Sequence, residues 1–266
     1  MNLEARIEKV CKRLDCLGDQ DIEGGSRITW LLSELHAIDE LSKDKKALRI
    51  TFQQSSDIAW ERVFIYGGQY SLLQGLMDHI PRRLPPSETY KLQYLGVRVV
   101  ANCLACFQIS GTSFSYIENL VLRMVSSNTK LAIGVLVVYE GCLQPLRSYS
   151  VCSKVVDKLI EQTKLAREVH ISLRTKIVRI VNIYYISFPE KIPSRTVHAL
   201  SLFLISSCRI AHHYKDGGSP KRYIVTVFKA VTSFIQAFPQ FDEGCEIFDR
   251  KKELENLMRY DSISDT

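Results

Sequence analysis

The sequence lacks an apolar run long enough to cross a membrane. Its longest apolar stretches, Leu131 to Tyr139 and Val197 to Ile205, are well short of the ~20 residues that a spanning helix needs. There is no N-terminal signal peptide, because Met1 to Leu17 alternates charged and apolar residues, and no Asn-x-Ser/Thr acceptor for glycosylation. These absences predict a soluble protein of the cytoplasm or nucleus, without membrane insertion.

Motifs for catalysis or phosphate binding are also missing. The glycine pairs Gly67-Gly68 and Gly217-Gly218 are not followed by Lys-Ser or Lys-Thr, as a phosphate-binding loop would require. Four histidines have no serine, cysteine or carboxylate pattern beside them that suggests a catalytic triad. These are His36, His79, His170 and His198. We therefore expect no enzyme and no cofactor.

The eight cysteines include one short motif, Cys103-x-x-Cys106. A redox pair needs a thiolate at an exposed helix start, whereas these thiols lie in the last turns of an apolar helical pattern. A zinc site needs a second pair at matching spacing, and none follows. The motif therefore favours reduced thiols packed in the core, with no metal.

His212-His213 is the other candidate for a metal ligand or a base. Adjacent residues on a helix point about 100° apart, so both imidazoles do not easily reach one ion. The alternative is a solvated helix end that carries cations near its C-terminus, and the pattern favours this alternative.

What the sequence does contain is a large apolar fraction and an uneven charge. Hydrophobic residues make up 46% and charged residues 24%, which is typical of a folded chain. The net charge is +6. Between residues 150 and 230, 14 lysines and arginines stand against 5 acidic residues, so the basic excess lies in this third quarter.

Amphipathic helices are predicted at the N-terminus. Apolar residues recur at spacings of three and four over residues 3–17 and, after a cap at Ser26, over residues 28–41. The first set is Leu3, Ile7, Val10, Cys11, Leu14 and Leu17, and the second is Ile28, Leu31, Leu32, Leu35, Ile38 and Leu41. A third helical segment from Asp44 to about Tyr66 is expected to break near Ser55 and Ser56.

The centre of the chain repeats a two-helix pattern. A short aromatic and aliphatic segment begins at residues 70, 114 and 149, and a second helix follows each copy. The second helices are predicted at Thr89 to Phe107, Leu131 to Leu143 and Ala166 to Ile186, with Ser87 as the cap of the first. Such units, about 40 residues long, bury their apolar faces only by stacking on neighbours. Three further helices are expected at Ser194 to His213, Pro220 to Phe238 and Glu246 to Tyr260.

These repeats resemble the armadillo repeat family. The family's glycine turn and second helix are similar to Gly67-Gly68-Gln69-Tyr70-Ser71-Leu72-Leu73, with Leu76-Met77. Its third helix is similar to Val99-Val100-Ala101-Asn102-Cys103-Leu104-Ala105. The resemblance implies a right-handed α-solenoid of armadillo-like or HEAT-like repeats. Residues 1–66 would be capping helices, 67–188 the repeats and 189–266 the C-terminal helices with a short polar tail, in one continuous domain.

The resemblance also implies a groove. In peptide-binding armadillo proteins an asparagine row on the third helices holds the backbone of an extended partner. The matching row here is Asn102, Glu140 and Asn182, with Arg98 one turn before Asn102. Glu140 departs from the family's asparagine, and no tryptophan accompanies the row.

A basic patch is predicted in the third quarter. Lys164, Arg167 and Arg174 recur at spacings of three and seven, and Lys176 and Arg179 add charge nearby, as do Lys221 and Arg222. Such a patch would attract phosphate or an acidic peptide. The alternative is the solvated face of amphipathic helices.

Together these features predict a non-enzymatic scaffold or adaptor that binds a peptide or helix of a partner, with a preference for acidic sequence, as a subunit of a larger complex. The second hypothesis is a helical-repeat protein that binds nucleic acid through residues 150–230.

Overall fold

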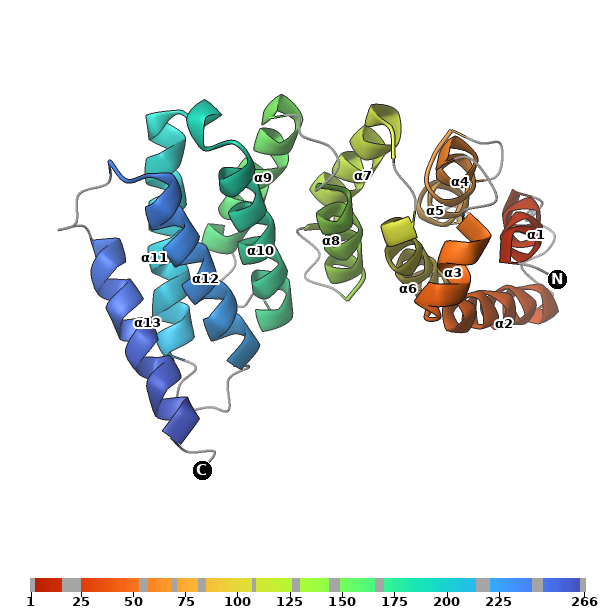
Figure 1. The fold of residues 1–266 in the computed structure, drawn as a ribbon. Coiled ribbons are helices and arrows are strands. Elements are labelled where there is room, and N and C mark those ends of the chain that lie inside the picture. The colour runs from red at the N-terminus through yellow and green to blue at the C-terminus, as the bar shows by residue number, and fades with distance from the viewer. Residues whose placement is uncertain are drawn as a thin grey trace. The chain divides into compact units, whose positions relative to one another are not determined.

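The computed structural model of the chain is helical throughout the residues that it describes (Figure 1). These are residues 3–15, 25–52, 57–67, 71–80, 85–106, 109–125, 130–143, 149–165, 170–213, 221–240 and 246–263. The prediction of an all-α fold is confirmed for them. They pack into two compact units, Met1–Leu146 and Arg147–Thr266.

The boundary between the units lies inside residues 67–188, the segment that the sequence assigns to the repeats. Each unit buries apolar side chains of its own. The order of capping helices, repeats and C-terminal helices within one continuous solenoid stays a prediction.

Unit 1 begins with α1 (Leu3–Asp15), which packs against α2 (Gly25–Ser42). The predicted apolar faces are largely buried in both helices, as shown by Leu3, Ile7, Val10, Cys11, Leu14, Ile28, Leu31, Leu35 and Ile38. Leu41 was wrongly placed on the buried face, because it is 47% exposed while Ser42 is buried. The Ser42 hydroxyl donates to the carbonyl of Asp39 at 2.7 Å, so a polar bond closes the last turn of α2.

The predicted broken helix appears as α3 (Lys45–Phe52) and α4 (Asp57–Phe64). The residues of the break, Ser55 and Ser56, lie outside the described residues. Three aromatic side chains join the two helices, with ring centroids 4.3 Å apart for Phe52 and Trp60 and 5.9 Å apart for Trp60 and Phe64. All three are buried, and such aromatic contacts give α3 and α4 a common core.

Both helices of the first two repeat copies are present. The first copy consists of α5 (Leu72–Gln74), which continues as a π-helical turn (Gly75–His79), and α6 (Pro86–Cys103) with a 3-10 turn (Leu104–Cys106). The second consists of α7 (Gly111–Met124) and α8 (Lys130–Leu143). Within unit 1, α6 packs between α2 and α8, and α7 packs on α8.

The turn before the first copy uses a glycine for its conformation. Gly67 has a φ of +94°, which lies in the left-handed region that glycine adopts without steric cost. This agrees with the predicted turn at Gly67, and Gly68 lies outside the described residues.

The start of α6 differs from the prediction. Ser87 was expected to cap the helix, but the helix already begins at Pro86, and Ser87 lies in its first turn. Proline suits this position because its φ is fixed near the helical value and its missing N–H has no helical partner there. Glu88 still lies in the first turn, where a carboxylate is favourable.

Two glycines allow α6 to approach its neighbours closely. A methyl group on Gly96 would lie 2.0 Å from Cδ1 of Leu76 in the π-helical turn. One on Gly134 of α8 would lie 2.8 Å from Cγ1 of Val97 in α6. Real Cβ atoms do not approach other atoms this closely, so the packing of α6 depends on the absence of a side chain at both positions.

Unit 2 contains α9 (Tyr149–Leu165), α10 (Ile171–Ser187), α11 (Ser194–His213), α12 (Lys221–Ala237) and α13 (Glu246–Ile263). The third repeat copy corresponds to α9 and α10, which pack on each other. Helix α12 packs against α10, α11 and α13, so it is the central helix of this unit.

Tyr185 joins α10 to α12. Its ring meets Phe234 edge-on, with centroids 5.6 Å apart, and also contacts Phe238 just beyond α12. Its hydroxyl donates to the carbonyl of Ala230, which satisfies a polar group in a buried place. Burial raises the pKa of Tyr185 well above its usual range. Because these contacts join the C-terminal halves of both helices, α10 and α12 run side by side in the same direction (Figure 1).

The substitution Gly96→Ala is expected to lower the free energy of unfolding by about 1–3 kcal/mol, because the added methyl group overlaps Leu76. Chemical denaturation of the purified chain measures this change. Gly111→Ala is the control, since no atom lies within 4 Å of its added methyl group, and it should change the stability by less than about 0.5 kcal/mol. Equal losses in the two variants would contradict the close approach at Gly96.

Candidate functional site

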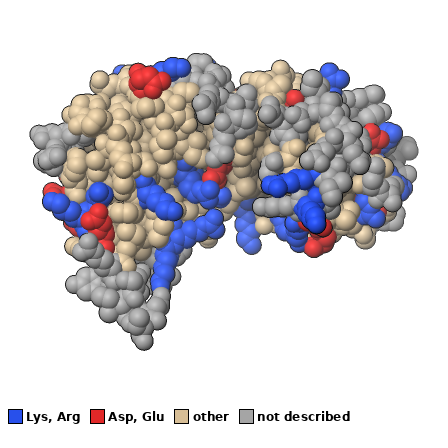
Figure 2. All heavy atoms as spheres, viewed as in Figure 1, with Lys and Arg blue, Asp and Glu red and all other residues tan. Residues whose placement is uncertain are grey.

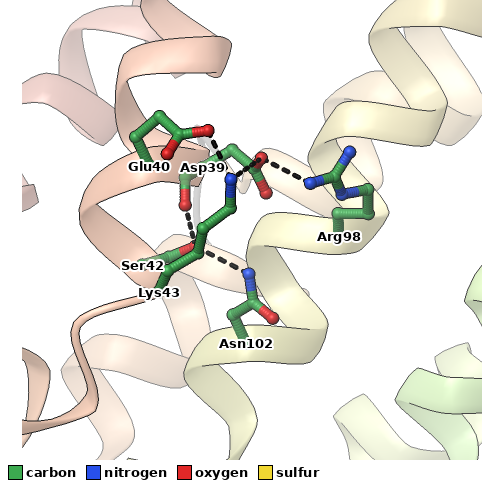
Figure 3. Close-up of polar contacts among 6 residues, drawn as sticks. All are labelled: Asp39, Glu40, Ser42, Lys43, Arg98 and Asn102. Atoms are coloured by element: carbon green, nitrogen blue, oxygen red, sulfur yellow. Dashed lines mark hydrogen bonds and ion pairs between the residues drawn. The ribbon is translucent and has the colours of Figure 1, made fainter.

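A buried carboxylate joins the C-terminal end of α2 to α6 (Figure 3). The side chain of Asp39 is 2% exposed, and its Oδ2 accepts a hydrogen bond from Nη2 of Arg98 at 2.7 Å. The ammonium group of Lys43 lies 3.7 Å from the same oxygen. A carboxylate removed from water is costly unless it is paired, so Arg98 supplies the main compensating charge for Asp39.

Asn102, one turn after Arg98, makes a second contact to α2. Its Nδ2 donates to Oγ of Ser42 at 2.9 Å, and that hydroxyl in turn donates to the carbonyl of Asp39. Figure 3 shows both α6 side chains pointing toward the end of α2. Two residues of the predicted groove row thus hold α2 against α6, and their contact with a partner stays a prediction.

Arg98 also ends a stack of side chains along α6. The rings of Tyr90 and Tyr94 are nearly parallel, with centroids 6.4 Å apart, and the Arg98 guanidinium carbon lies 5.7 Å from the Tyr94 centroid. Cations are attracted to aromatic faces at this range. The side chain of Arg98 is still 39% exposed. Its ion pair with Asp39 and its contact with Tyr94 therefore hold the guanidinium at the surface of unit 1.

The other two residues of the predicted row lie in different units. Glu140 is half-buried on α8 of unit 1, and Asn182 is half-buried on α10 of unit 2. A row that includes all four residues therefore stays a prediction.

Oδ1 of Asn182 is a buried atom without a hydrogen-bond partner among the described residues, and Oγ1 of Thr232 on α12 is another.

The predicted basic patch is only partly present. Arg174 was wrongly placed in it, because Arg174 is buried at 7% exposure. It shares a helix face with the buried Ile177 and Val178, where the long stem of an arginine packs well. Arg167 lies outside the described residues, and so does the side chain of Lys164.

Cations gather instead on α10, where they are half-buried, and on α12, where they are exposed, as Figure 2 shows for this part of unit 2. On each of the two helices, cations and aliphatic side chains lie along one stripe. We call the two stripes together the α10–α12 surface. It consists of Lys176, Arg179, Ile183 and Ile186 on α10 and of Lys221, Arg222, Val225 and Lys229 on α12. Neither helix contains an aspartate or a glutamate.

Two aliphatic residues of the α10–α12 surface are unusually exposed. Ile186 is 49% exposed and Val225 is 37% exposed. Sequence reasoning identified Lys176, Arg179, Lys221 and Arg222 but missed Lys229 and these aliphatic residues. The signal that would have found the surface is the absence of acidic residues from residues 171–189 and 217–241.

Unit 2 also contains an ion-pair cluster between α11 and α13. Arg209 of α11 pairs with Glu246 of α13 at 2.6 Å, and Arg250 lies 3.1 Å from the same carboxylate. The hydrogen bonds from Arg209 and Arg250 hold the pKa of Glu246 below its usual value. Arg209 is therefore matched within unit 2 by a carboxylate of α13.

Four of the cysteines whose side chains the structure describes are buried, as the sequence predicted, whereas Cys16, Cys245 and the side chain of Cys152 lie outside the described residues. Cys103 is buried in α6 and Cys106 is half-buried in the 3-10 turn that follows. Burial raises the pKa of Cys103, and of Cys142 in α8, well above the usual value. It raises the pKa of Cys11 and of Cys208 to about 12. Protonated, enclosed thiols are poor nucleophiles.

His212 and His213 are both exposed in the last turn of α11. Within the described ranges, no three histidine, cysteine, aspartate or glutamate side chains come close enough together to hold a metal ion. The same residues include no helix with the length and apolar character to cross a membrane.

Arg98→Met is expected to lower the free energy of unfolding by about 1–3 kcal/mol, because it leaves the buried Asp39 carboxylate without its main partner. The double variant with Asp39→Asn should lose less than the sum of the two single changes. Urea denaturation of the unchanged chain, the two single variants and the double variant gives the coupling free energy between Asp39 and Arg98. Lys91→Met, at an exposed position of the same helix, is the control and should be nearly neutral. An unchanged stability of Arg98→Met would show that Arg98 does not hold α2 against α6.

Cys11, Cys103, Cys142 and Cys208 are expected to react slowly with iodoacetamide in the folded chain. Their raised pKa values leave less thiolate at about pH 8 than a free cysteine has, and their rates should rise only in more alkaline solution. Peptide mapping by mass spectrometry, with denaturant-unfolded chain as the control, measures each rate. Labelling of folded Cys103 as fast as in the unfolded chain would contradict its packing.

Comparisons with protein-family models, with curated proteins and with solved structures found no match to this chain. The armadillo resemblance therefore rests on the sequence segments quoted above and stays a prediction. The geometry of the two units is the basis for a functional proposal.

Proposed function

We propose that the chain is a non-enzymatic interaction scaffold, an adaptor or complex subunit that binds a protein partner through the α10–α12 surface. The observation that supports this proposal is the mixture of cations and exposed aliphatic side chains on two packed helices that contain no acidic residue. Asn182, one of the predicted groove residues, belongs to the same helix as Lys176 and Arg179.

Two physical effects favour a partner on this surface. The cations attract a ligand of opposite charge and fix its orientation. The exposed Ile186 and Val225 leave water only when another apolar group covers them, and each Å² of apolar area so covered contributes roughly 25 cal/mol. The combination suits a partner with both acidic and apolar side chains.

Nucleic acid is the second candidate, because the same lysines and arginines would bind phosphates. The exposed aliphatic residues favour protein, since they gain little from a phosphate backbone. Charge alone supports both ligands, so the experiment includes a nuclease step.

The proposal predicts that a protein partner co-purifies with the tagged chain from native extract and remains after nuclease treatment. The double substitution Arg222→Glu, Lys229→Glu should reduce its yield at least about tenfold, because four units of charge change on the α10–α12 surface. Quantitative mass spectrometry of the eluates measures the yield.

The control is Lys154→Glu, Lys252→Glu, which makes the same change of net charge at exposed positions of α9 and α13. This variant should keep the partner. Equal yields with the two double variants would contradict the use of the α10–α12 surface, and loss of the material with nuclease would favour nucleic acid.

A further inference from the structure

Four of the five cations of the α10–α12 surface lie in the first halves of the two helices. Lys176 and Arg179 lie in the first half of α10, and Lys221 and Arg222 open α12. Because α10 and α12 run in the same direction (Figure 1), these four cations lie toward one end of the surface, and Lys229 lies near the middle of α12.

On α10 the other end is aliphatic, whereas on α12 Val225 lies between Arg222 and Lys229. Ile183 and Ile186 continue the same stripe of α10 at spacings of three and four from Arg179. Lys176 and Ile186 are separated by about 15 Å along the helix axis. The α10 part of the surface therefore changes from basic to aliphatic within about three helical turns.

The backbone adds to the positive end. The N-termini of α10 and α12 lie on the same side of the surface, and each helix N-terminus carries a partial positive charge. The first turn of α10 is closed by a hydrogen bond from the Ser172 N–H to Nδ1 of His170 at 3.2 Å. Lys221 and Arg222, in the first turn of α12, thus stand where the helix dipole also favours an anion.

We infer that the ligand of this surface is an acidic amphipathic helix of a partner protein. Its carboxylates lie over the basic end, and its aliphatic side chains cover Ile183 and Ile186. This inference rests on the proposed function and adds the chemical class, the secondary structure and the orientation of the partner.

An amphipathic helix fits the dimensions of the surface. An α-helix places an acidic group and an aliphatic group ten residues apart on one face at about 15 Å, the same separation as between Lys176 and Ile186. A nucleic acid carries charge along its whole length, and a surface that binds it usually offers aromatic rings for base stacking. Among the described residues, the aromatic side chains of α10 and α12 are buried or half-buried.

Two polar atoms beneath the surface support a ligand with hydrogen-bonding groups. Oδ1 of Asn182 and Oγ1 of Thr232 have no hydrogen-bond partner among the described residues. Asn182 lies one turn from both Arg179 and Ile186, where the basic and aliphatic parts of the surface meet. Rotation of the Asn182 side chain would place its amide next to a polar group of the bound helix. A hydrogen bond from that group would then satisfy Oδ1.

The test uses three fluorescent probes and the full chain. The first is a synthetic helical peptide with glutamates in its first half and leucines in its second half on one face. The second replaces each leucine by serine, and the third is an oligothymidylate of equal charge. Anisotropy titrations at about 50 mM and about 200 mM salt give the affinities and their salt dependence. The leucine peptide should bind at least about tenfold more tightly than the other two at the higher salt.

Variants locate the binding and its orientation. Arg222→Glu, Lys229→Glu should weaken both peptides at least about tenfold, whereas Ile186→Ser should weaken only the leucine peptide. The double control Lys154→Glu, Lys252→Glu should change neither. Tightest binding of the oligothymidylate, with a steep loss at the higher salt, would overturn the inference in favour of nucleic acid.

The outcomes also separate this inference from the proposed function. Equal affinities for the leucine and serine peptides would overturn the helix inference. The scaffold would stand in that case if a nuclease-resistant partner still depended on Arg222 and Lys229. Absence of both the peptide binding and that dependence would overturn the proposed function as well.

Discussion

The close approach of α6 to its neighbours is the constraint on which unit 1 depends. Gly96 lets the π-helical turn with Leu76 lie directly against α6, and Gly134 lets α8 lie against Val97. With the helices at these distances, the apolar stripes of single repeats become one core, because none of these helices buries its face alone. The spacing of α6 and α8 also fixes which residues of α6 remain at the surface, and these include Tyr94 and Arg98.

This constraint explains why polar groups at the end of α2 are buried. Helix α2 packs on α6, and Asp39 faces Arg98 at 2.7 Å in that contact. A single salt bridge on the surface contributes little to stability, but a carboxylate that is 2% exposed requires its partner. Arg98 and Asn102 therefore have a structural role that a binding role would have to share.

The helices could be predicted from the sequence, because the apolar spacing and the punctuating Pro and Gly residues are local signals. The exceptions have tertiary causes. Leu41 fits the apolar period, yet the last turn of α2 is closed by the polar bond of Ser42. Arg174 counts as a cation in any sequence pattern, yet it lies on the face of α10 that Ile177 and Val178 bury. No periodicity reveals which of two adjacent faces meets a neighbour, so the candidate site could be predicted only in part.

The α10–α12 surface differs in composition from an ordinary solvated helix face. A solvated helix face usually mixes both signs of charge, and Arg209 with Glu246 shows this mixing in the same unit. Helices α10 and α12 hold only cations and place aliphatic residues in the same stripes. Exposed aliphatic groups add no solubility, and cations that gather on two packed helices repel one another. An acidic amphipathic helix relieves both costs at once, because its carboxylates offset the cations and its apolar face covers Ile183 and Ile186.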